Sequence, residues 1–335
     1  MSFQDRTKNK EVNLDLHTFI STPSKHRIHC YVKGNPNNSI PVIIVHGGPG
    51  SSISKASLDV FDTKKFLLYE FDQRSCGKSY PKYQNQDNNT SELVEDIERI
   101  RKHFNLDKVV LFGGSWETTL ALLYAIKYPQ NVSTLLLRGV FLARQEDVDY
   151  LYKPNGASQF YPDKFHEFNK AVWYYPGQNV LEKYHYAWLK MQKIQNPNKR
   201  FFSLAKLAKK FTDWENALVS IKTSENIDDN SNATKNARID MMFNQLHYFL
   251  NNSFLKYDNY ILAKTYKIKN IKTYIVHGRQ DVDTRPVGAY LLARKLKKCK
   301  LAFIDAAAHS VKEDGIFKKL KEYSEEIYND LISEK

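Results

Sequence analysis

The chain has 335 residues and a formal net charge of +13, and 42% of its residues are hydrophobic. Tyr and Phe are abundant, at 21 and 19 residues, and Gly contributes only 13, so the composition excludes a disordered or low-complexity chain. The lysines are scattered, and the longest basic cluster, 294–298, has the spacing of a solvated helix face. We therefore expect no nucleic-acid partner.

The sequence also indicates where in the cell the protein is expected. Its three cysteines are too few and too dispersed for a disulfide framework or a metal site. The stretch 1–13 is polar and lacks the apolar core of a signal peptide, and no apolar run is long enough to span a bilayer. We therefore expect a soluble cytoplasmic protein without membrane contact, either a monomer or a small homo-oligomer.

Strands and helices alternate in the first hundred residues. Residues 26–32 alternate as an edge strand does, and 34–38 predict a turn. The unbroken apolar run at 41–45 predicts a strand buried on both faces, and 66–71 predicts another strand. Asn89 then opens a helix whose apolar residues recur at helical spacing, so that helix is expected to pack on the sheet.

The strand at 41–45 runs directly into His46-Gly47-Gly48-Pro49-Gly50. A plain turn needs fewer glycines than this. Three glycines and a proline after a buried strand let the backbone approach a ligand closely, so this loop is a candidate binding loop.

A second glycine-rich turn follows the apolar run 109–112 and precedes an apolar helical segment at 120–124. In so sharp a strand-to-helix turn, Ser115 would be held in a strained backbone conformation with its hydroxyl exposed. The N–H of Trp116 would point into the same space, as it does at the nucleophile elbow of α/β-hydrolases. Ser115 is therefore the candidate nucleophile and the amide of Trp116 a candidate oxyanion donor.

In α/β-hydrolases the loop after an earlier strand supplies the second oxyanion donor. Here that loop is 46–50, and we expect the amide of Gly48 to be the donor, with Gly47 as the alternative. One residue departs from the elbow pattern G-x-S-x-G, because Glu117 stands where the second glycine is expected. A carboxylate is electrostatically acceptable near a helix N-terminus, but this one must find room where helix and strand come close.

Beyond a further buried strand at 132–137, the chain changes character. Residues 142–262 are aromatic, polar and lysine-rich, and they lack convincing buried strands, so they predict helices with long connections. The apolar strand pattern resumes at 271–276, a helix begins near Pro286, and a last strand follows at 301–304.

The alternation of strands and helices is thus interrupted once and then completed. This pattern predicts an α/β fold, a doubly wound and mostly parallel sheet of the α/β-hydrolase type with an inserted helical cap. The expected division is a core in two parts, 1–141 and 263–335, with the cap at 142–262.

Candidate acid and base residues follow the last two strands. Asp281 comes after the penultimate strand and His309 after the last, and with Ser115 they give the order Ser, Asp, His that the α/β-hydrolase triad requires. Asp283 and Asp305 are nearby acids, and each is an alternative partner for the imidazole.

Several blocks of sequence are shared with a known enzyme family. They are His46-Gly47-Gly48-Pro49-Gly50, Asp72-Gln73-Arg74, Cys76-Gly77-Lys78-Ser79, Gly113-Gly114-Ser115-Trp116, Leu137-Arg138-Gly139-Val140-Phe141, Trp214-Glu215, His247-Tyr248-Phe249 and Val276-His277-Gly278-Arg279. In these blocks the chain resembles the proline iminopeptidases of the larger bacterial kind. The resemblance implies a serine exopeptidase that releases N-terminal proline from peptides, without a metal or an organic cofactor.

The resemblance also implies a substrate pocket. In it, the serine of the triad attacks the carbonyl after proline while the histidine takes its proton. Glu215, from the cap, would meet the charged imino group, and Phe141 and Phe249 would form the apolar pocket for the pyrrolidine ring. A carboxylate paired with a fixed ammonium would explain why only a free N-terminus is accepted.

The family carries a second cap carboxylate in an A-R-I-E-x-H-Y-F block, which is interrupted here. Residues 237–240 are separated from 247–249 by extra residues. If the register follows the second half of the block, Gln245 replaces the glutamate and one amine-binding charge is lost. If it follows the first half, Asp240 keeps that charge but needs a rearranged loop.

Two other hypotheses stay open. An esterase or a broader aminopeptidase on the same fold would cleave simple esters or non-proline amides better than proline amides. A catalytically impaired homologue, with Glu117 crowding the elbow, would bind peptides without turnover.

Overall fold

The computed structural model describes residues 14–37, 39–222 and 229–334. The polar stretch 1–13, on which the expectation of no signal segment rests, lies outside these residues, as does Asn38 at the end of the predicted turn. The predicted strands and helices alternate in the expected order.

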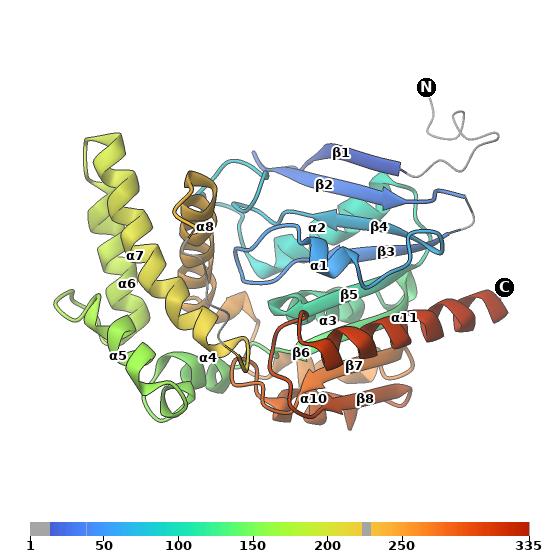
Figure 1. The fold of residues 1–335 in the computed structure, drawn as a ribbon. Helices are drawn as coiled ribbons and strands as arrows, with labels where there is room; N and C mark the ends of the chain where they lie inside the picture. The colour runs from blue at the N-terminus through green and yellow to red at the C-terminus, as the bar shows by residue number, and fades with distance from the viewer. Residues whose placement is uncertain (1–13, 38, 223–228, 335) are drawn as a thin grey trace.

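Within the described residues, eight strands form one sheet in the order β1-β2-β4-β3-β5-β6-β7-β8 (Figure 1). β2 pairs antiparallel with both β1 and β4, and the other neighbours pair in parallel. This mostly parallel sheet confirms the predicted fold class. The strands are β1 (Leu14–Ser21), β2 (Arg27–Gly34), β3 (Ile40–Val45), β4 (Phe66–Phe71), β5 (Val109–Ser115), β6 (Val132–Val140), β7 (Lys272–Gly278) and β8 (Cys299–Ile304).

The prediction of an edge strand at 26–32 is wrong. The strand there, β2, lies between β1 and β4, and β1 forms the edge. Alternate residues of β1 are only partly buried, so its sequence carries a weaker apolar signal than the strands buried on both faces.

The sheet is covered by helices on both faces because successive side chains of its strands point to opposite sides. In β3, Ile43 and Val45 join the apolar cluster that contains α2 and α3, whereas Val42 and Ile44 join the cluster that contains α1 and α11. The helices in chain order are α1 (Lys55–Leu58), α2 (Thr90–His103), α3 (Trp116–Lys127), α4 (Gln145–Tyr152), α5 (Pro162–Lys170), α6 (Val180–Gln192), α7 (Pro197–Leu218), α8 (Asn232–Phe249), α9 (Tyr260–Lys264), α10 (Pro286–Ala293) and α11 (Asp314–Ser333).

Helices α4 to α9 lie between β6 and β7 in the chain, and α5 to α8 stand beyond one end of the sheet (Figure 1). Contacts place this region over the carboxyl ends of the strands. Asn244 of α8 donates a hydrogen bond to the carbonyl of Ser75, which follows β4, at 3.5 Å. Ser310, which follows β8, donates its N–H to the carbonyl of Val219 at the end of α7, at 2.8 Å. The boundaries 142 and 262 remain predictions.

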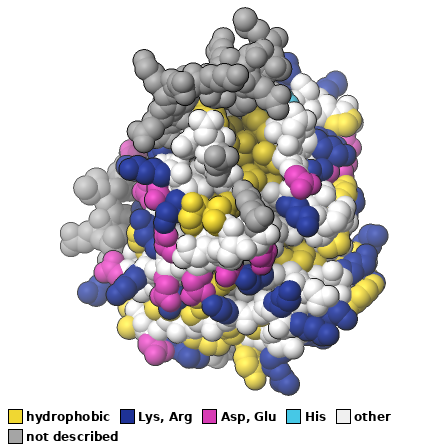
Figure 2. Space-filling view, turned by 90° about the vertical axis from the view of Figure 1, so that its right-hand side faces the viewer, with side chains coloured by type: hydrophobic (Ala, Val, Ile, Leu, Met, Phe, Trp, Pro, Cys, Tyr) yellow, Lys and Arg dark blue, Asp and Glu magenta, His cyan; other side chains and the backbone are white. Residues whose placement is uncertain are grey.

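The charged residues do not gather on the face shown in Figure 2, where Lys and Arg are interspersed with Asp and Glu. The basic cluster 294–298 is not helical as its spacing predicted, because α10 ends at Ala293 and a turn leads to β8. Over the described ranges, each helix is either too short or too polar to cross a bilayer. The cytoplasmic location stays a prediction.

A buried ion pair connects β4 to α2. The guanidinium of Arg74, whose side chain is 0% exposed, donates from Nε and Nη2 to the two carboxylate oxygens of Asp96 at 2.7 and 2.9 Å. Arg99 also contacts Asp96, but its side chain is 22% exposed.

We expect Arg74→Met to lower the free energy of unfolding by about 3 to 5 kcal/mol, because it leaves the Asp96 carboxylate buried without its main partner. Arg99→Met removes a pair that reaches solvent and should lower it by less than about 1 kcal/mol. Guanidinium chloride unfolding of both variants measures the difference. A loss of stability in Arg74→Met as small as that in Arg99→Met would mean that Arg99 alone can compensate the buried carboxylate of Asp96.

Candidate active site

Ser115 is the last residue of β5 and lies at the N-terminus of α3, as the sharp turn in the sequence predicts. Its backbone has φ 67° and ψ −133°, a conformation that costs a non-glycine residue about 1–3 kcal/mol. Its hydroxyl makes no capping hydrogen bond to the helix. A Cβ on Gly114, the residue before it, would overlap the guanidinium of Arg138, so a larger residue there would displace that side chain.

His309 and Asp281 form a hydrogen-bonded pair. Nδ1 of His309 lies 2.8 Å from Oδ2 of Asp281, and both side chains are buried. Thr284 donates its N–H and its hydroxyl to the same carboxylate at 2.8 and 2.9 Å, and Nε2 of His277 lies 3.3 Å from it. Burial favours protonation of Asp281, but His309 and His277 outweigh it and hold the pKa of the carboxyl below its usual range. Nδ1 of His309 therefore faces the carboxylate of Asp281, and Nε2 faces away from it.

The partners of Nε2 are Arg138 and Asp283. Nη1 of Arg138 donates to Nε2 and to the carbonyl of His309, both at 2.9 Å, and Oδ2 of Asp283 lies 3.2 Å from Nε2. No hydrogen bond joins Ser115 to His309 in the part of the chain that the structure describes.

Ser115 and His309 are nevertheless brought close by the sheet. Ser115 pairs with Val140 of the neighbouring strand β6. A Cβ on Gly139, the residue before Val140, would lie 2.8 Å from both Cε1 and Nδ1 of His309. The absence of a side chain at Gly139, whose φ is 54°, thus lets the imidazole lie directly against the strand next to the serine.

The two alternative acids occupy different places. Asp305 is largely exposed and pairs with Arg279 at 3.3 Å, away from the imidazole. Asp283 is buried and contacts Nε2 rather than Nδ1. Burial and the nearby Asp281 raise the pKa of Asp283 above its usual value. Asp281 is thus the acid in position to orient the imidazole.

Of the predicted oxyanion donors, Trp116 directly follows the serine and Gly48 lies in the loop after β3. Trp116 is the first residue of α3, so its N–H is one of those that a helix leaves unpaired at its N-terminus. Gly48 has φ 119°, in the region that favours glycine. Gln73 orders the loop, because its backbone N–H donates to Nε2 of His46 at 2.7 Å and its amide oxygen accepts from Nε1 of Trp116 at 3.3 Å. The choice of Gly48 over Gly47 stays a prediction.

Glu117 does not crowd Ser115. Its carboxylate turns back and accepts a hydrogen bond from the N–H of Gly114, and it lies beside Gly47 of the candidate binding loop. It is buried, at 5% exposure, and burial raises its pKa to about 8 although Arg138 opposes the rise. Glu70, also buried, has its pKa raised by burial and further by the charge of Glu117.

The cap residues Glu215 and Gln245 meet above the sheet. Tyr152 of α4 donates its hydroxyl to Oε1 of Glu215 at 2.7 Å, and that hydroxyl lies 3.0 Å from Oε1 of Gln245. Nε2 of Gln245 donates to the other oxygen of Glu215 at 3.3 Å. Burial and the neighbouring Asp283 raise the pKa of Glu215 to about 8. Asp283, which contacts His309, is therefore also close to the cap acid.

Aromatic rings surround this acid. Phe249 lies 6.1 Å from Phe141, 6.4 Å from Trp116 and 5.7 Å from Tyr152, measured between ring centroids. Phe141 and Phe249 are therefore neighbours on an apolar wall that Trp116 extends to the elbow.

Asp240 and Gln245 lie in different surroundings. Asp240 forms an ion pair with Lys82 of the core at 2.6 Å, on another turn of α8. Gln245 is the residue that contacts Glu215. The geometry therefore follows the second half of the interrupted sequence block, in which an amide replaces the second acid.

The sequence did not indicate the positions of Arg138 and Tyr152. Arg138 belongs to a block that resembles the family, but a positive charge at the end of a strand does not show which way it points. Tyr152 sits in an aromatic-rich region without a motif. As for cofactors, no three His, Cys, Asp or Glu side chains of the described ranges cluster as metal ligands do.

Comparison with known proteins places this site in a class. Residues 40–316 match the model of the α/β-hydrolase fold family. Among solved structures, a haloalkane dehalogenase from Bradyrhizobium elkanii aligns with a TM-score of 0.63 at 14% identity, covering 95% of this chain and 99% of that one. An esterase from Exiguobacterium antarcticum aligns with a TM-score of 0.61 at 16% identity, covering 93% and 99%. At these identities the likeness concerns the fold. The chain is an α/β-hydrolase.

Curated relatives narrow the class. A proline iminopeptidase from Arabidopsis thaliana is 33% identical over 303 residues, which cover 88% of this chain and 75% of the relative. Proline iminopeptidases from Neisseria gonorrhoeae and Neisseria meningitidis serogroup B are 33% and 32% identical, each covering 88% of this chain and 91% of the relative. The chain belongs to the proline iminopeptidase family.

Glu117 yields a prediction on stability. In the folded protein the pKa of Glu117 is raised from 4.5 to about 8. Between pH 4.5 and pH 8 the folded protein therefore keeps a proton on Glu117 that the unfolded chain has lost. The free energy of unfolding accordingly falls as the pH rises through this range. Glu117→Gln cannot ionise, and its amide oxygen can still accept from Gly114. We expect its free energy of unfolding, relative to wild type, to be about 3 kcal/mol higher at pH 8 than at pH 5.5.

Glu98 supplies the control for this measurement. Although burial opposes it, bonding to Arg101 and Tyr124 lowers the pKa of Glu98 to about 2, so Glu98→Gln should destabilise the protein at both pH values. Denaturant unfolding at the two pH values measures both variants. A gain for Glu117→Gln that does not depend on pH would mean that Arg138 keeps Glu117 ionised throughout.

Proposed function

We propose that this chain is an active proline iminopeptidase, a serine exopeptidase that releases N-terminal proline through a Ser115, His309 and Asp281 triad and an acyl-enzyme. One observation carries the proposal. The buried cap acid Glu215 is near enough to Asp283 for that acid to raise its pKa, and Asp283 contacts Nε2 of His309, so an amine-binding carboxylate lies in the neighbourhood of the proposed base. The names of the relatives support the same activity.

In the proposed mechanism His309 is the general base. Its Nδ1–H donates to Asp281, so Nε2 can take the proton of Ser115 as the serine oxygen attacks the carbonyl of proline. Nε2 accepts from Arg138 in the structure, and this hydrogen bond has to give way to the serine hydroxyl. His309 then protonates the leaving nitrogen as its bond to the carbonyl carbon breaks.

The backbone N–H groups of Gly48 and Trp116 stabilise the oxyanion of the tetrahedral intermediate. Loss of the peptide leaves proline bound as an ester on Ser115. Water, deprotonated by His309, attacks that ester and releases free proline. The helix N-terminus at Trp116 favours the developing negative charge.

Glu215 accounts for the requirement for a free N-terminus. In the absence of a nearby cation the pKa of Glu215 is about 8. The positive charge of the bound imino group would lower this pKa, so the carboxyl would be ionised when it pairs with proline. Gln245 adds a hydrogen-bonding amide but no second negative charge. The rings of Phe141 and Phe249 enclose the apolar ring of the substrate.

The direct test compares chromogenic amides of proline, alanine and leucine with a simple ester, using wild type and Ser115→Ala. We expect proline amide to be cleaved with the highest kcat/KM, and Ser115→Ala to lower kcat by at least about 10³-fold. Better cleavage of the ester or of the other amides would instead identify an esterase or a broader aminopeptidase. A well-folded wild type without turnover would favour the impaired homologue.

Glu215→Gln tests the binding of the imino group. It removes a charge-assisted hydrogen bond, so we expect kcat/KM for proline amide to fall about 10- to 100-fold while ester cleavage persists. In wild type, kcat/KM should rise with pH towards about 8 as Glu215 loses its proton, and the variant should lack this rise.

Glu167→Gln is the matched control, because Glu167 is an exposed cap acid that pairs with the surface lysines Lys170 and Lys210. It should leave both kcat/KM and its pH profile unchanged. A loss in Glu215→Gln that is equal for the ester and the amide would show that the acid shapes the pocket rather than binding the amine.

A further inference from the structure

Asp283 is a buried acid that the proposed mechanism does not use. It lies in the loop after β7, and 9% of it is exposed. Its Oδ2 lies 3.2 Å from Nε2 of His309, the nitrogen that takes the proton of Ser115 in the proposed reaction. Asp281 contacts the opposite nitrogen, Nδ1. Of these two acids, Asp283 is therefore the one on the side of the imidazole where the substrate reacts.

Glu215 approaches the same place from the cap. Burial and the charge of Asp283 raise the pKa of Glu215 to about 8. Burial, Glu215 and Asp283 likewise raise the pKa of Tyr152, whose hydroxyl donates to Glu215 at 2.7 Å. One acid of α7 and one acid of the core thus share a pocket. Gln245, which contacts Glu215 at 3.3 Å, is a neutral amide and adds no charge to it.

This acid pair lacks a cation of its own. Within the described ranges, neither Glu215 nor Asp283 forms an ion pair with a lysine or an arginine. Burial and the nearby Asp281 raise the pKa of Asp283, although His309 and Arg138 oppose the rise. Two buried acids that lie close together ionise at low cost only if a cation joins them. The pocket is therefore suited to a ligand that brings one positive charge.

The imino group of a substrate brings that charge to this place. Only Cα separates the imino nitrogen from the carbonyl carbon that Ser115 attacks, so the cation has to bind close to the imidazole of His309. We propose that Asp283 is a second amine-binding carboxylate, and that the imino group binds between Glu215 and Asp283. The inference rests on the proposed function and adds a residue that determines its specificity.

The contact of Asp283 with the imidazole gives this residue a second effect. When the imino group binds, Asp283 exchanges Nε2 of His309 for the cation, and Nε2 keeps only its hydrogen bond from Arg138. The serine hydroxyl then has one partner of Nε2 to displace instead of two. A substrate without an amine leaves Asp283 on Nε2, so it reacts more slowly even when it is bound.

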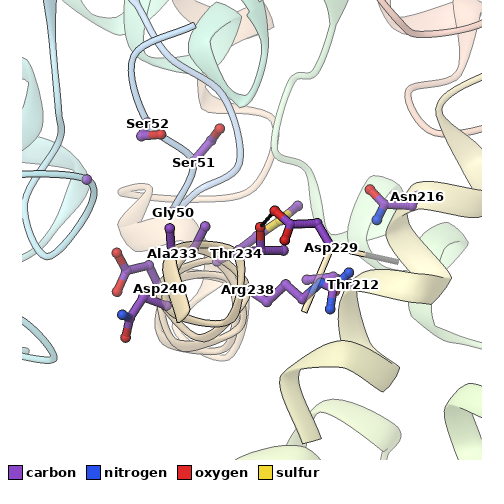
Figure 3. A pocket seen from close by; sticks show the side chains of 14 residues that line it. Gly50, Ser51, Ser52, Thr212, Asn216, Asp229, Ala233, Thr234, Arg238 and Asp240 are labelled. Atoms are coloured by element: carbon purple, nitrogen blue, oxygen red, sulfur yellow. Dashed lines mark hydrogen bonds between the residues drawn. The ribbon is translucent and has the colours of Figure 1, made fainter. Parts of the chain in front are cut away.

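Asp240, a buried acid of α8, does not reach this pocket. It lines, together with the loop after β3, a separate cavity of about 630 Å³ (Figure 3). The described residues that line this cavity include neither Glu215 nor Asp283. A Cβ on Gly50 would lie 2.6 Å from Cα of Met241, so the loop and α8 touch at backbone level and hold Asp240 on that side of the helix.

The test compares wild type and Asp283→Asn on the chromogenic proline amide and on p-nitrophenyl acetate, an ester without an amine. We expect kcat/KM for the amide to fall at least tenfold relative to kcat/KM for the ester, because a carboxylate that holds the cation is lost. Asp283→Ser is the second variant if Asp283→Asn does not fold. Asp305→Asn is the matched control, since Asp305 is an exposed acid that pairs with Arg279, and it should leave the ratio unchanged.

A charge returned from the cap separates amine binding from a purely structural role. Gln245 contacts Glu215, so Gln245→Glu brings a second carboxylate to the same pocket. In the Asp283→Asn background we expect this change to raise the ratio at least threefold. Competitive inhibition by pyrrolidine, a ring cation, should weaken in Asp283→Asn and recover in the double variant. Inhibition by cyclopentanol, a neutral ring of the same size, should stay the same in all three proteins.

An unchanged ratio in Asp283→Asn, an equal loss for both substrates, or a double variant without recovery would overturn the inference and leave the peptidase intact. If folded wild type does not cleave the proline amide, the proposed function fails. Pyrrolidine inhibition of ester cleavage then decides separately whether Asp283 binds a ring cation.

Discussion

The guanidinium of Arg138 connects parts of the site that come from separate segments of the chain. It fills the space that Gly114 leaves next to the elbow, and it donates to both the ring and the carbonyl of His309. Burial raises the pKa values of Glu117 and Asp283, and the positive charge of Arg138 partly offsets this rise at both acids. Arg138 is only partly buried, but the acids and the imidazole around it are buried, so removing it leaves their charges without compensation, and the arrangement of the elbow and the imidazole depends on this side chain.

The sequence was sufficient for the core of the fold because its strands are buried on both faces. Unbroken apolar runs such as 41–45 and 109–112 are stable only where both faces of the sheet are covered. Ser115, Asp281 and His309 could be singled out because each follows a strand at the same edge of the sheet. The error at 26–32 arose where this signal weakens, because a strand with alternating polar residues has the same sequence pattern at the edge of a sheet and one position inside it.

The cap site could not be derived in the same way. Gln245 and Asp240 lie on one helix, five residues apart, and only the packing of α8 against α4 and α7 decides which of them meets Glu215. The direction of Glu117 is a similar case. Its sequence position predicts a clash, whereas its side chain finds the N–H of Gly114, a donor that the backbone of the elbow leaves unpaired.

The contact of Gly50 with α8 limits how the cap can change over evolution. Because the loop and the helix touch at backbone level, α8 cannot shift along its axis without displacing the loop that carries Gly48. The far tip of the cap, where Trp173 and Tyr174 are largely exposed, has no such anchor. We therefore expect insertions and deletions at the tip between α5 and α6 to leave the loop after β3 in place, whereas a shift in the register of α8 would displace it.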